Sequence, residues 1–111
     1  MGIVKKSSGI DFANLSIKEA FEELKETNKE LHKHLTRAFN DILENAFCGR
    51  AVKKRLIPKE YLKKYDNLWI YNLPDAWRLL YSIKSPNKIE IISIILDWMN
   101  HRDYERLFRF T

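Results

Sequence analysis

The sequence predicts one α+β domain over residues 1–111, in which an N-terminal helical hairpin packs on one face of a small antiparallel sheet. Three observations support this fold class. Apolar residues recur every three or four positions in the first half of the chain, and they alternate or run continuously in the second half. The segments of the second half are joined by short turns, which favour antiparallel neighbours. Apolar residues make up 45% of the 111 positions, which is enough for one folded core.

Two helices are predicted in the N-terminal half. Ser16 with Glu19, and Thr27 with Glu30, have the S/T-x-x-E pattern of a capping box. Apolar side chains follow at helical spacing, at Ile17, Ala20, Phe21 and Leu24 in the first helix and at Leu31, Leu35, Ala38, Phe39, Ile42, Leu43 and Ala46 in the second. Gly49 is predicted to end the second helix in a left-handed cap. The two helices form a hairpin with one apolar face.

Strand patterns begin after a short predicted helix that starts at Pro58. Three segments have the composition and alternation of strands: residues 67–73 (NLWIYNL), 76–84 (AWRLLYSIK) and 88–96 (KIEIISIIL). A final helical segment over residues 100–108 is predicted to be capped by Asn100. Because the helical hairpin covers one face of the sheet, we expect the other face to be free.

Arg78 interrupts the second predicted strand on that free face. In a strand, Arg78 shares its face with Leu80 and Ser82. An arginine in this position must place its charged head in water, against an anion or against a carboxylate. Two interpretations therefore stand: Arg78 pairs with Asp75 or Glu90 within the chain, or it is available to an external anion.

Positive charge is concentrated in the second half of the chain, which has a net charge of +5 overall. Residues 1–47 carry seven Lys or Arg and eight Asp or Glu, whereas residues 48–111 carry thirteen and seven. Residues 50–64 alone hold seven cations and one acid, Glu60. The asymmetry predicts a polyanionic partner, either a nucleic acid or an acidic protein segment. A membrane surface is less favoured, because no basic amphipathic helix accompanies the charge.

The sequence disfavours several kinds of site. A single cysteine, Cys48, allows no disulfide within the chain and no cysteine-based zinc site. His32 and His34 are two positions apart on a predicted helix and point to different faces, so they do not form a metal pair. The chain has three glycines and no glycine-rich phosphate loop. We therefore expect no cofactor and no metal. The lack of a signal-peptide run and of a long apolar span predicts a soluble, cytoplasmic protein.

Three segments carry a family resemblance: FCGRAVKKRLIPKEY from residue 47, LWIYNLPDAWRLLYSI from residue 68 and IEIISIILDWMNHRDYERLF from residue 89. A strand with the pattern W-R-L-x-Y-x-I, then a turn, an apolar strand and a polar cluster with His, Arg and Tyr, resembles the RelE/ParE superfamily of toxins from type II toxin–antitoxin systems. The resemblance covers roughly residues 38–108 and implies a compact, RelE-like α+β toxin. The family opens with a strand before the helices, for which GIVK or GIDF is the candidate here.

The resemblance also implies a function and a set of residues. Many members of the superfamily cut mRNA in the ribosomal decoding site. Their middle-strand arginine corresponds to Arg78. Their post-strand cluster corresponds to His101, Arg102 and Tyr104. Their basic segment corresponds to Lys53, Lys54 and Arg55. The expected partners are mRNA on the ribosome and an acidic antitoxin, one helix of which would lie over residues 50–64 and the free sheet face.

These side chains suit a metal-independent cleavage in which the RNA 2′-OH attacks the adjacent phosphorus. Arg78 and Arg102 are expected to bind phosphate oxygens and spread the charge of the phosphorane. The imidazole of His101 suits the base or the acid. Tyr104 suits proton donation or stacking on a base. The RNA backbone would be held by Lys53, Lys54 and Arg55 and steered by Lys63 and Lys64.

Each role competes with a structural interpretation. In that interpretation His101 caps a helix or pairs near Asp103, and Arg102 faces solvent. Tyr104, four positions before Phe108, anchors a core. The tryptophans divide likewise: Trp69 and Trp77 are predicted to be core, and Trp98 is left open between core and base stacking.

Two other functions compete with the nuclease. The first is a ParE-like toxin that inhibits DNA gyrase by binding, in which the polar cluster would matter little. The second is a degenerate, non-catalytic module that binds an antitoxin or a nucleic acid. Both retain the basic second half of the chain and differ from the nuclease in what they require of Arg78 and Tyr104.

Overall fold

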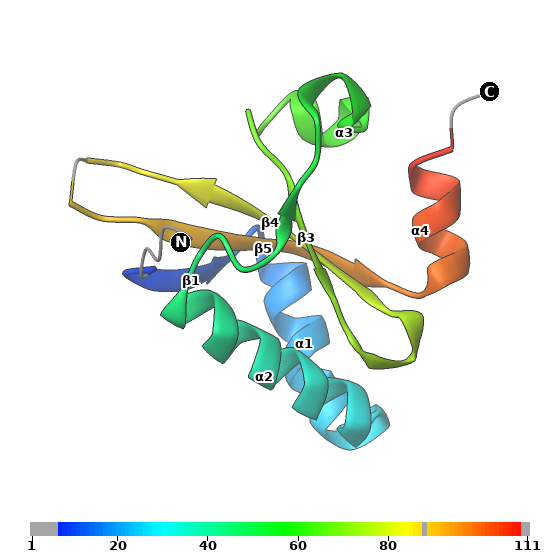
Figure 1. Cartoon of the computed structure of the whole chain (residues 1–111). Helices are drawn as coiled ribbons and strands as arrows, with labels where there is room; N and C mark the ends of the chain where they lie inside the picture. The colour runs from blue at the N-terminus through cyan, green and yellow to red at the C-terminus, as the bar shows by residue number, and fades with distance from the viewer. Residues whose placement is uncertain (1–6, 88, 110–111) are drawn as a thin grey trace.

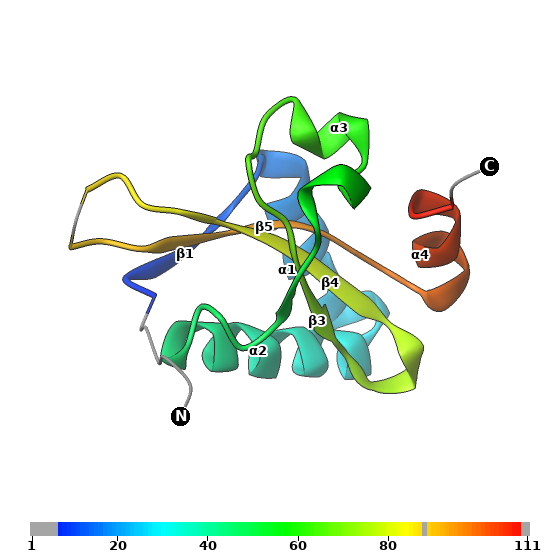
Figure 2. The same ribbon diagram turned by 45° about the horizontal axis from the view of Figure 1, so that its top comes forward.

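The computed structural model describes residues 7–87 and 89–109 and has an α+β fold (Figures 1 and 2). Helices α1 and α2 lie on one face of a five-stranded sheet, and α3 lies over the opposite face. The elements in chain order are β1 (Gly9–Phe12), α1 (Leu15–Thr27), α2 (Lys29–Glu44), β2 (Arg50–Ala51), η1 (Lys54–Leu56), α3 (Lys59–Leu62), β3 (Trp69–Asn72), η2 (Pro74–Ala76), β4 (Arg78–Lys84), β5 (Ile92–Met99) and α4 (His101–Leu107).

The sheet is mixed, which corrects the prediction of a purely antiparallel sheet. Its strand order is β1-β5-β4-β3-β2. The three strands predicted from pattern, β3, β4 and β5, are antiparallel neighbours. The short edge strand β2, which the pattern does not predict, is antiparallel to β3, whereas β1 is parallel to β5. A parallel pair is possible because the helices and three strands separate β1 from β5 in sequence and carry the chain across the sheet.

Strand β1 is formed by GIDF, one of the two candidates for a strand before the helices. The other candidate, GIVK, lies outside the described residues. The short helix after Pro58 and the helix capped by Asn100 are confirmed as α3 and α4. The predicted boundaries of β5 are displaced, because this strand runs from Ile92 to Met99 rather than over residues 88–96.

The helices α1 and α2 begin at asparagine caps and not at the predicted capping boxes. Asn14 Oδ1 accepts a hydrogen bond from the Ile17 N–H at 3.0 Å, and Asn28 Oδ1 accepts one from the Leu31 N–H at 3.2 Å. Asparagine caps a helix about as well as serine, so the two kinds of signal compete in this stretch. The second helix ends at Glu44, with Asn45 as its C-cap, and so Gly49 is not its cap.

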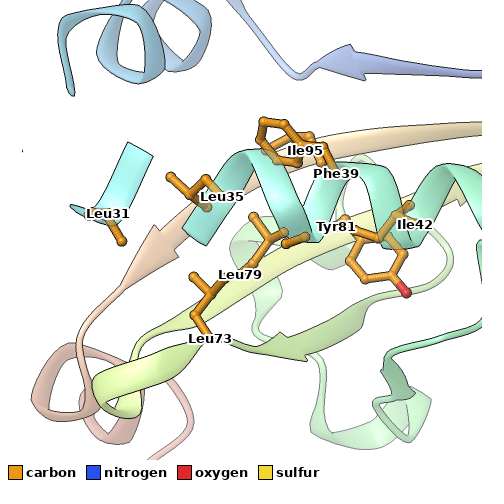
Figure 3. Packing of buried hydrophobic residues seen from close by; sticks show 9 residues of the cluster. Leu31, Leu35, Phe39, Ile42, Leu73, Leu79, Tyr81 and Ile95 are labelled. Atoms are coloured by element: carbon orange, nitrogen blue, oxygen red, sulfur yellow. The ribbon is translucent and has the colours of Figure 1, made fainter. Parts of the chain in front are cut away.

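The main core lies between α2 and the central strands, as predicted from the apolar stripe (Figure 3). The buried residues of α2 are Leu31, Leu35, Ala38, Phe39 and Ile42. They pack against Leu79, Tyr81 and Ile95 from β4 and β5, and Trp69, Trp77 and Trp98 pack around this cluster. All three tryptophans are partly buried and pack against the core, which agrees with the prediction for Trp69 and Trp77 and shows the same packing for Trp98.

The opposite face of the sheet is largely covered, which corrects the prediction of a free face. Leu68, Leu80 and Leu96 are buried there beneath Ile57, and side chains of α3 and α4 pack around them. Apolar side chains such as Leu68, Leu80 and Leu96 cannot remain in water at low cost, and the segment around α3 covers them. The uncovered part of this face is therefore confined to the ends of the strands.

The β3–β4 turn contains two non-glycine residues in the left-handed region. Asp75 has φ 60° and Ala76 has φ 61°. The turn is closed by a hydrogen bond from the Leu73 N–H to the Trp77 carbonyl at 2.9 Å. Asp tolerates this conformation, whereas a Cβ without polar partners makes it costly for Ala. The strained position lies two residues before Arg78.

Replacing Ala76 by glycine is expected to stabilise the protein by about 0.5–1 kcal/mol, since the relief of left-handed strain exceeds the entropy that glycine gains in the unfolded chain. Ala76 is exposed, so the substitution removes no packing. The matched control is Ala20→Gly within α1, which should destabilise by a similar amount. Urea denaturation measures both, and a destabilised Ala76→Gly variant would contradict the strain.

Candidate functional site

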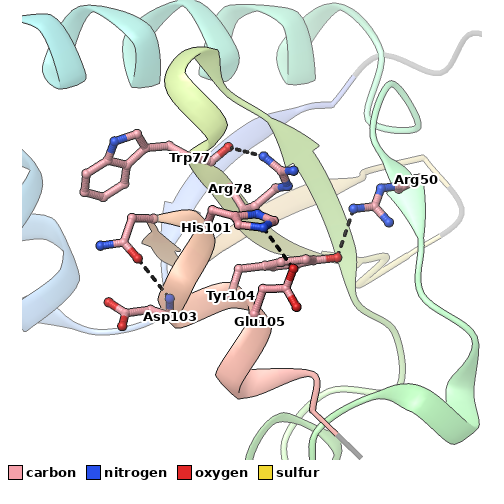
Figure 4. A network of polar contacts seen from close by, with 8 residues as sticks. Arg50, Trp77, Arg78, His101, Asp103, Tyr104 and Glu105 are labelled. Atoms are coloured by element: carbon pink, nitrogen blue, oxygen red, sulfur yellow. Dashed lines mark hydrogen bonds and ion pairs between the residues drawn. The ribbon is translucent and has the colours of Figure 1, made fainter.

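Two arginines from separate strands meet one tyrosine of α4. Arg78 is the first residue of β4 and lies opposite Met99, the last residue of β5. From Met99 the chain passes directly into α4, which places Tyr104 beside Arg78. Arg50 begins β2 and reaches the same tyrosine from beyond β3 (Figure 4). We call Arg50, Arg78 and Tyr104 the arginine–tyrosine cluster.

The contacts within the arginine–tyrosine cluster are polar and cation–π. Arg50 Nη2 donates a hydrogen bond to Tyr104 Oη at 2.9 Å. The guanidinium carbon of Arg78 lies 5.3 Å from the centroid of the Tyr104 ring, and that of Arg50 lies 6.0 Å from it. Tyr104 Oη accepts in the bond with Arg50, so its own proton is not used by that bond.

No carboxylate among the described residues neutralises either arginine. The ion pairs among the described residues join other groups: His34 with Glu30, His101 with Glu105, and Arg106 with Asp103. The predicted alternative, in which Arg78 pairs with Asp75 or Glu90, is therefore wrong. Arg78 Nη1 instead donates to the Trp77 carbonyl at 3.2 Å, and its Nε is buried with no hydrogen-bond partner in the described structure. Both positive charges thus remain available to an external anion.

Helix α4 sets the orientation of the remaining polar residues. Asn100 Oδ1 accepts a hydrogen bond from the Asp103 N–H at 2.9 Å and so caps the helix. His101 Nε2 lies 2.9 Å from Glu105 Oε1, one turn along. These two residues share with Tyr104 one side of the helix (Figure 4). His101 therefore has an acidic partner, but the partner is Glu105 rather than Asp103.

Tyr104 combines a packed ring with a hydroxyl that contacts Arg50. Its ring packs against Phe108 at 4.9 Å between centroids, and Phe108 packs against the smaller core under α3. Its hydroxyl reaches out to Arg50. The anchored ring fixes where the hydroxyl lies.

Arg102 is exposed and lies outside the contacts of the arginine–tyrosine cluster. It follows His101 by one residue and therefore points about 100° away around the helix. With His101 and Tyr104 it lines an open depression of about 580 Å³, built from residues of α4 and Arg109. An open surface of this kind suits a polymer better than a small molecule, which is usually enclosed.

The predicted basic residues divide between two places. Lys53, Lys54 and Arg55 follow β2 directly and are exposed in and before η1. Lys63 and Lys64 follow α3 and are also exposed. Lys64 lines a depression at the far end of β4, away from Arg78. The structure therefore does not gather these lysines around a single point.

Arg50 is the residue of the cluster to which the sequence assigned no role. It belongs to the basic run of residues 50–64, but nothing in the pattern separates it from the other six cations. What distinguishes Arg50 is its place in the two-residue strand β2, where it pairs with Ile70 of β3. A strand this short depends on β3 and has no periodicity of its own.

Asp97 is a second group that sequence reasoning missed. It lies opposite Leu80 on β5, and its Oδ1 accepts a hydrogen bond from the Trp98 N–H at 2.8 Å. Burial raises the pKa of Asp97 above its usual value, and the nearby Glu60 and Asp103 carboxylates raise it further. This face of the sheet thus holds a carboxyl that gains a proton more readily than an exposed one.

The described residues contain neither a metal-binding cluster nor a membrane-spanning helix. No group of three or more His, Cys, Asp or Glu side chains is arranged to hold a metal ion in residues 7–87 and 89–109. Within the same ranges, no helix combines the length and apolar character needed to cross a membrane. Comparison with known proteins is likewise without result: no protein-family model matches the chain, and neither a curated protein nor a solved structure matches it significantly.

Proposed function

We propose that this protein is a RelE-like toxin, an endoribonuclease that cuts mRNA on the ribosome in the cytoplasm and is neutralised by an acidic antitoxin. One observation carries the proposal: Arg50 and Arg78 meet at Tyr104 with no carboxylate, among the described residues, to neutralise them. Two guanidinium groups that both contact one tyrosine offer planar donors suited to the oxygens of a phosphodiester. The strand β1 before the helices also agrees with what the resemblance implies.

The proposed reaction begins with attack of the RNA 2′-OH on the adjacent phosphorus. Arg78 and Arg50 would bind the non-bridging oxygens and stabilise the charge that grows on them. His101, with Glu105 on one nitrogen, would accept the 2′-OH proton through the other nitrogen. Tyr104, whose proton is not used by Arg50, would protonate the leaving 5′-oxygen. Arg102, Lys53, Lys54 and Arg55 would hold the flanking backbone.

Expression of the protein in a bacterial host is expected to stop growth and to leave new 5′ ends in translated messages. Primer extension on several abundant transcripts measures the cleavage, and co-expression of an acidic neighbouring reading frame should suppress it. Growth arrest with intact messages would refute the nuclease.

A ParE-like binding toxin is the second candidate, and one observation favours it. His101 is already in contact with Glu105, so the group best suited to be the base is partly occupied before any RNA binds. If the protein acts by binding, purified protein should inhibit the supercoiling activity of DNA gyrase, and transcripts should stay whole. Unchanged supercoiling at high protein concentration would eliminate this candidate.

A further inference from the structure

We infer that a second anion subsite, centred on Lys64 and Lys84, binds the backbone of the same RNA strand that the arginine–tyrosine cluster binds. The inference rests on the proposed function and extends it from one phosphodiester to a path along the molecule. The inference is drawn from a depression of about 470 Å³ at the Lys84 end of β4, the end farther from Arg78. The residues that line this depression are Lys64, Tyr65, Asp66, Ser82, Ile83, Lys84, Ser85 and Ile94.

The charge of the depression is positive. Lys64 and Lys84 are exposed, and neither takes part in an ion pair with any residue that the structure describes. Asp66 is the acid of the lining, and its Oδ1 accepts a hydrogen bond from Asn67 Nδ2 at 2.7 Å. Two ammonium groups against one carboxylate leave one positive charge for a ligand.

The two segments that form the walls of the depression are joined by hydrogen bonds within the protein. Asn67 Nδ2 donates to the Ile83 carbonyl at 2.9 Å, and Asn67 Oδ1 accepts from the Ile83 N–H at 2.8 Å. The Ser82 hydroxyl donates to the Asn67 carbonyl at 2.9 Å. These bonds hold the segment after α3 against the end of β4, so the backbones that carry Lys64 and Lys84 are at a fixed separation.

The subsite and the arginine–tyrosine cluster lie on the same face of the sheet. Arg78 and Lys84 are the two ends of β4, and residues an even number of positions apart point to one side of a strand. The irregularity in the β4–β5 pairing leaves an extra residue in β5, so the alternation within β4 is preserved. Six residue steps correspond to about 20 Å. The α3 segment, which covers this face of the sheet, exposes Lys59 and Lys63 together with one acid, Glu60.

A separation of about 20 Å requires a polymeric anion. At about 3.4 Å per stacked nucleotide, it corresponds to roughly six nucleotides of one strand, whereas a mononucleotide or an inorganic anion reaches only one end. An acidic peptide could span the same distance. The arginine forks at the other end match phosphate oxygens, and we therefore assign the path to RNA.

The test measures binding and not cleavage, using 2′-O-methyl RNA, which lacks the attacking hydroxyl. Fluorescence anisotropy compares oligonucleotides of about three and about nine nucleotides, one shorter and one longer than the path. The variant is Lys64→Gln with Lys84→Gln. Its matched control is Lys29→Gln with Lys33→Gln, two exposed lysines of α2 on the other side of the sheet. Circular dichroism confirms that both variants are folded.

The double variant should bind the longer RNA several-fold more weakly than wild type. The slope of log K against log salt should fall by about 1.4, because two contacts to a single strand are lost. The shorter RNA and the control variant should be unaffected. The inference is overturned if the double variant binds the longer RNA as wild type does, or if its affinity for both RNA lengths falls equally. It is also overturned if the double variant loses binding only of polyglutamate, which serves as the acidic-peptide probe. Absence of cleavage by the wild-type protein would refute the nuclease. The binding measurement would still be interpretable, because it does not depend on cleavage.

Discussion

Replacing Arg78 by alanine is expected to lower the rate of RNA cleavage by about a hundred- to a thousandfold, the usual cost of losing one well-placed donor to transition-state charge. Arg78 is partly buried, lies against the Tyr104 ring and meets no carboxylate in the described chain, so in the proposed mechanism its charge is available to the substrate. The measurement is single-turnover cleavage of a message bound to ribosomes.

Two further variants make the Arg78 result specific. Arg78→Lys keeps the charge but loses the planar fork, so it should recover little of the lost rate. Arg37→Ala removes an exposed arginine of α2 on the opposite side of the sheet and should cleave as wild type does. If Arg78→Ala cleaves as fast as Arg37→Ala, Arg78 has no part in the chemistry. If Arg78→Ala loses stability in a folding assay to the same degree as it loses cleavage, Arg78 has a structural role, through its contact with Tyr104.

The parts of the fold that the sequence predicts are those whose signals are local. The stripe on α2, the alternation in β4 and the Asn100 cap of α4 each depend on residues within one element, and all three are confirmed. The edge strand β2 has two residues and exists because β3 offers it hydrogen bonds. No pattern within two residues reveals such a partner, and the role of Arg50 was missed for the same reason.

The candidate site divides in the same way. Arg78 was singled out as a charge in an apolar strand and by the family resemblance, whereas Tyr104 was singled out by the resemblance, and the two residues meet. Arg102, Lys53, Lys54 and Arg55 were assigned by the resemblance, and Lys63 and Lys64 by their charge. Neither signal gives the direction in which a side chain points. The coverage of the second sheet face required knowing that Ile57 and the residues after it turn back over Leu80, which is a tertiary fact.

Gly49 shows how one residue can be singled out correctly and explained wrongly. It does not adopt a positive φ and does not cap α2, which ends five residues earlier. Its importance comes from distant neighbours: a Cβ at this position would lie 2.7 Å from the Ile70 carbonyl oxygen and 2.8 Å from Tyr81 Oη. Tyr81 Oη also accepts a hydrogen bond from the Gly49 N–H at 3.1 Å and donates one to the Ala46 carbonyl at 2.8 Å. Burial raises the pKa of Tyr81, which keeps this hydroxyl protonated.

Replacing Gly49 by alanine is therefore expected to destabilise the protein by about 2–3 kcal/mol, in the range of an overpacked interior, because the nearest obstacle is backbone and cannot rotate away. The matched control is Gly9→Ala, since a Cβ at Gly9 would meet nothing within 4 Å. This control should be neutral or slightly stabilising. Urea denaturation measures both, and equal stabilities would show that the β2 backbone adapts freely.

A double-mutant cycle separates the two obstacles to a side chain at Gly49. Tyr81→Phe removes the hydroxyl and its two hydrogen bonds but leaves the Ile70 carbonyl in place. The cost of Gly49→Ala should then fall in the Tyr81→Phe background without vanishing, since one of the two close contacts persists. Because Arg50 is the next residue, the strain that remains should displace β2 and weaken the contact with Tyr104. A Gly49→Ala protein that is folded at low temperature should thus cleave more slowly than Gly9→Ala, and equal rates would show that β2 is not what positions Arg50.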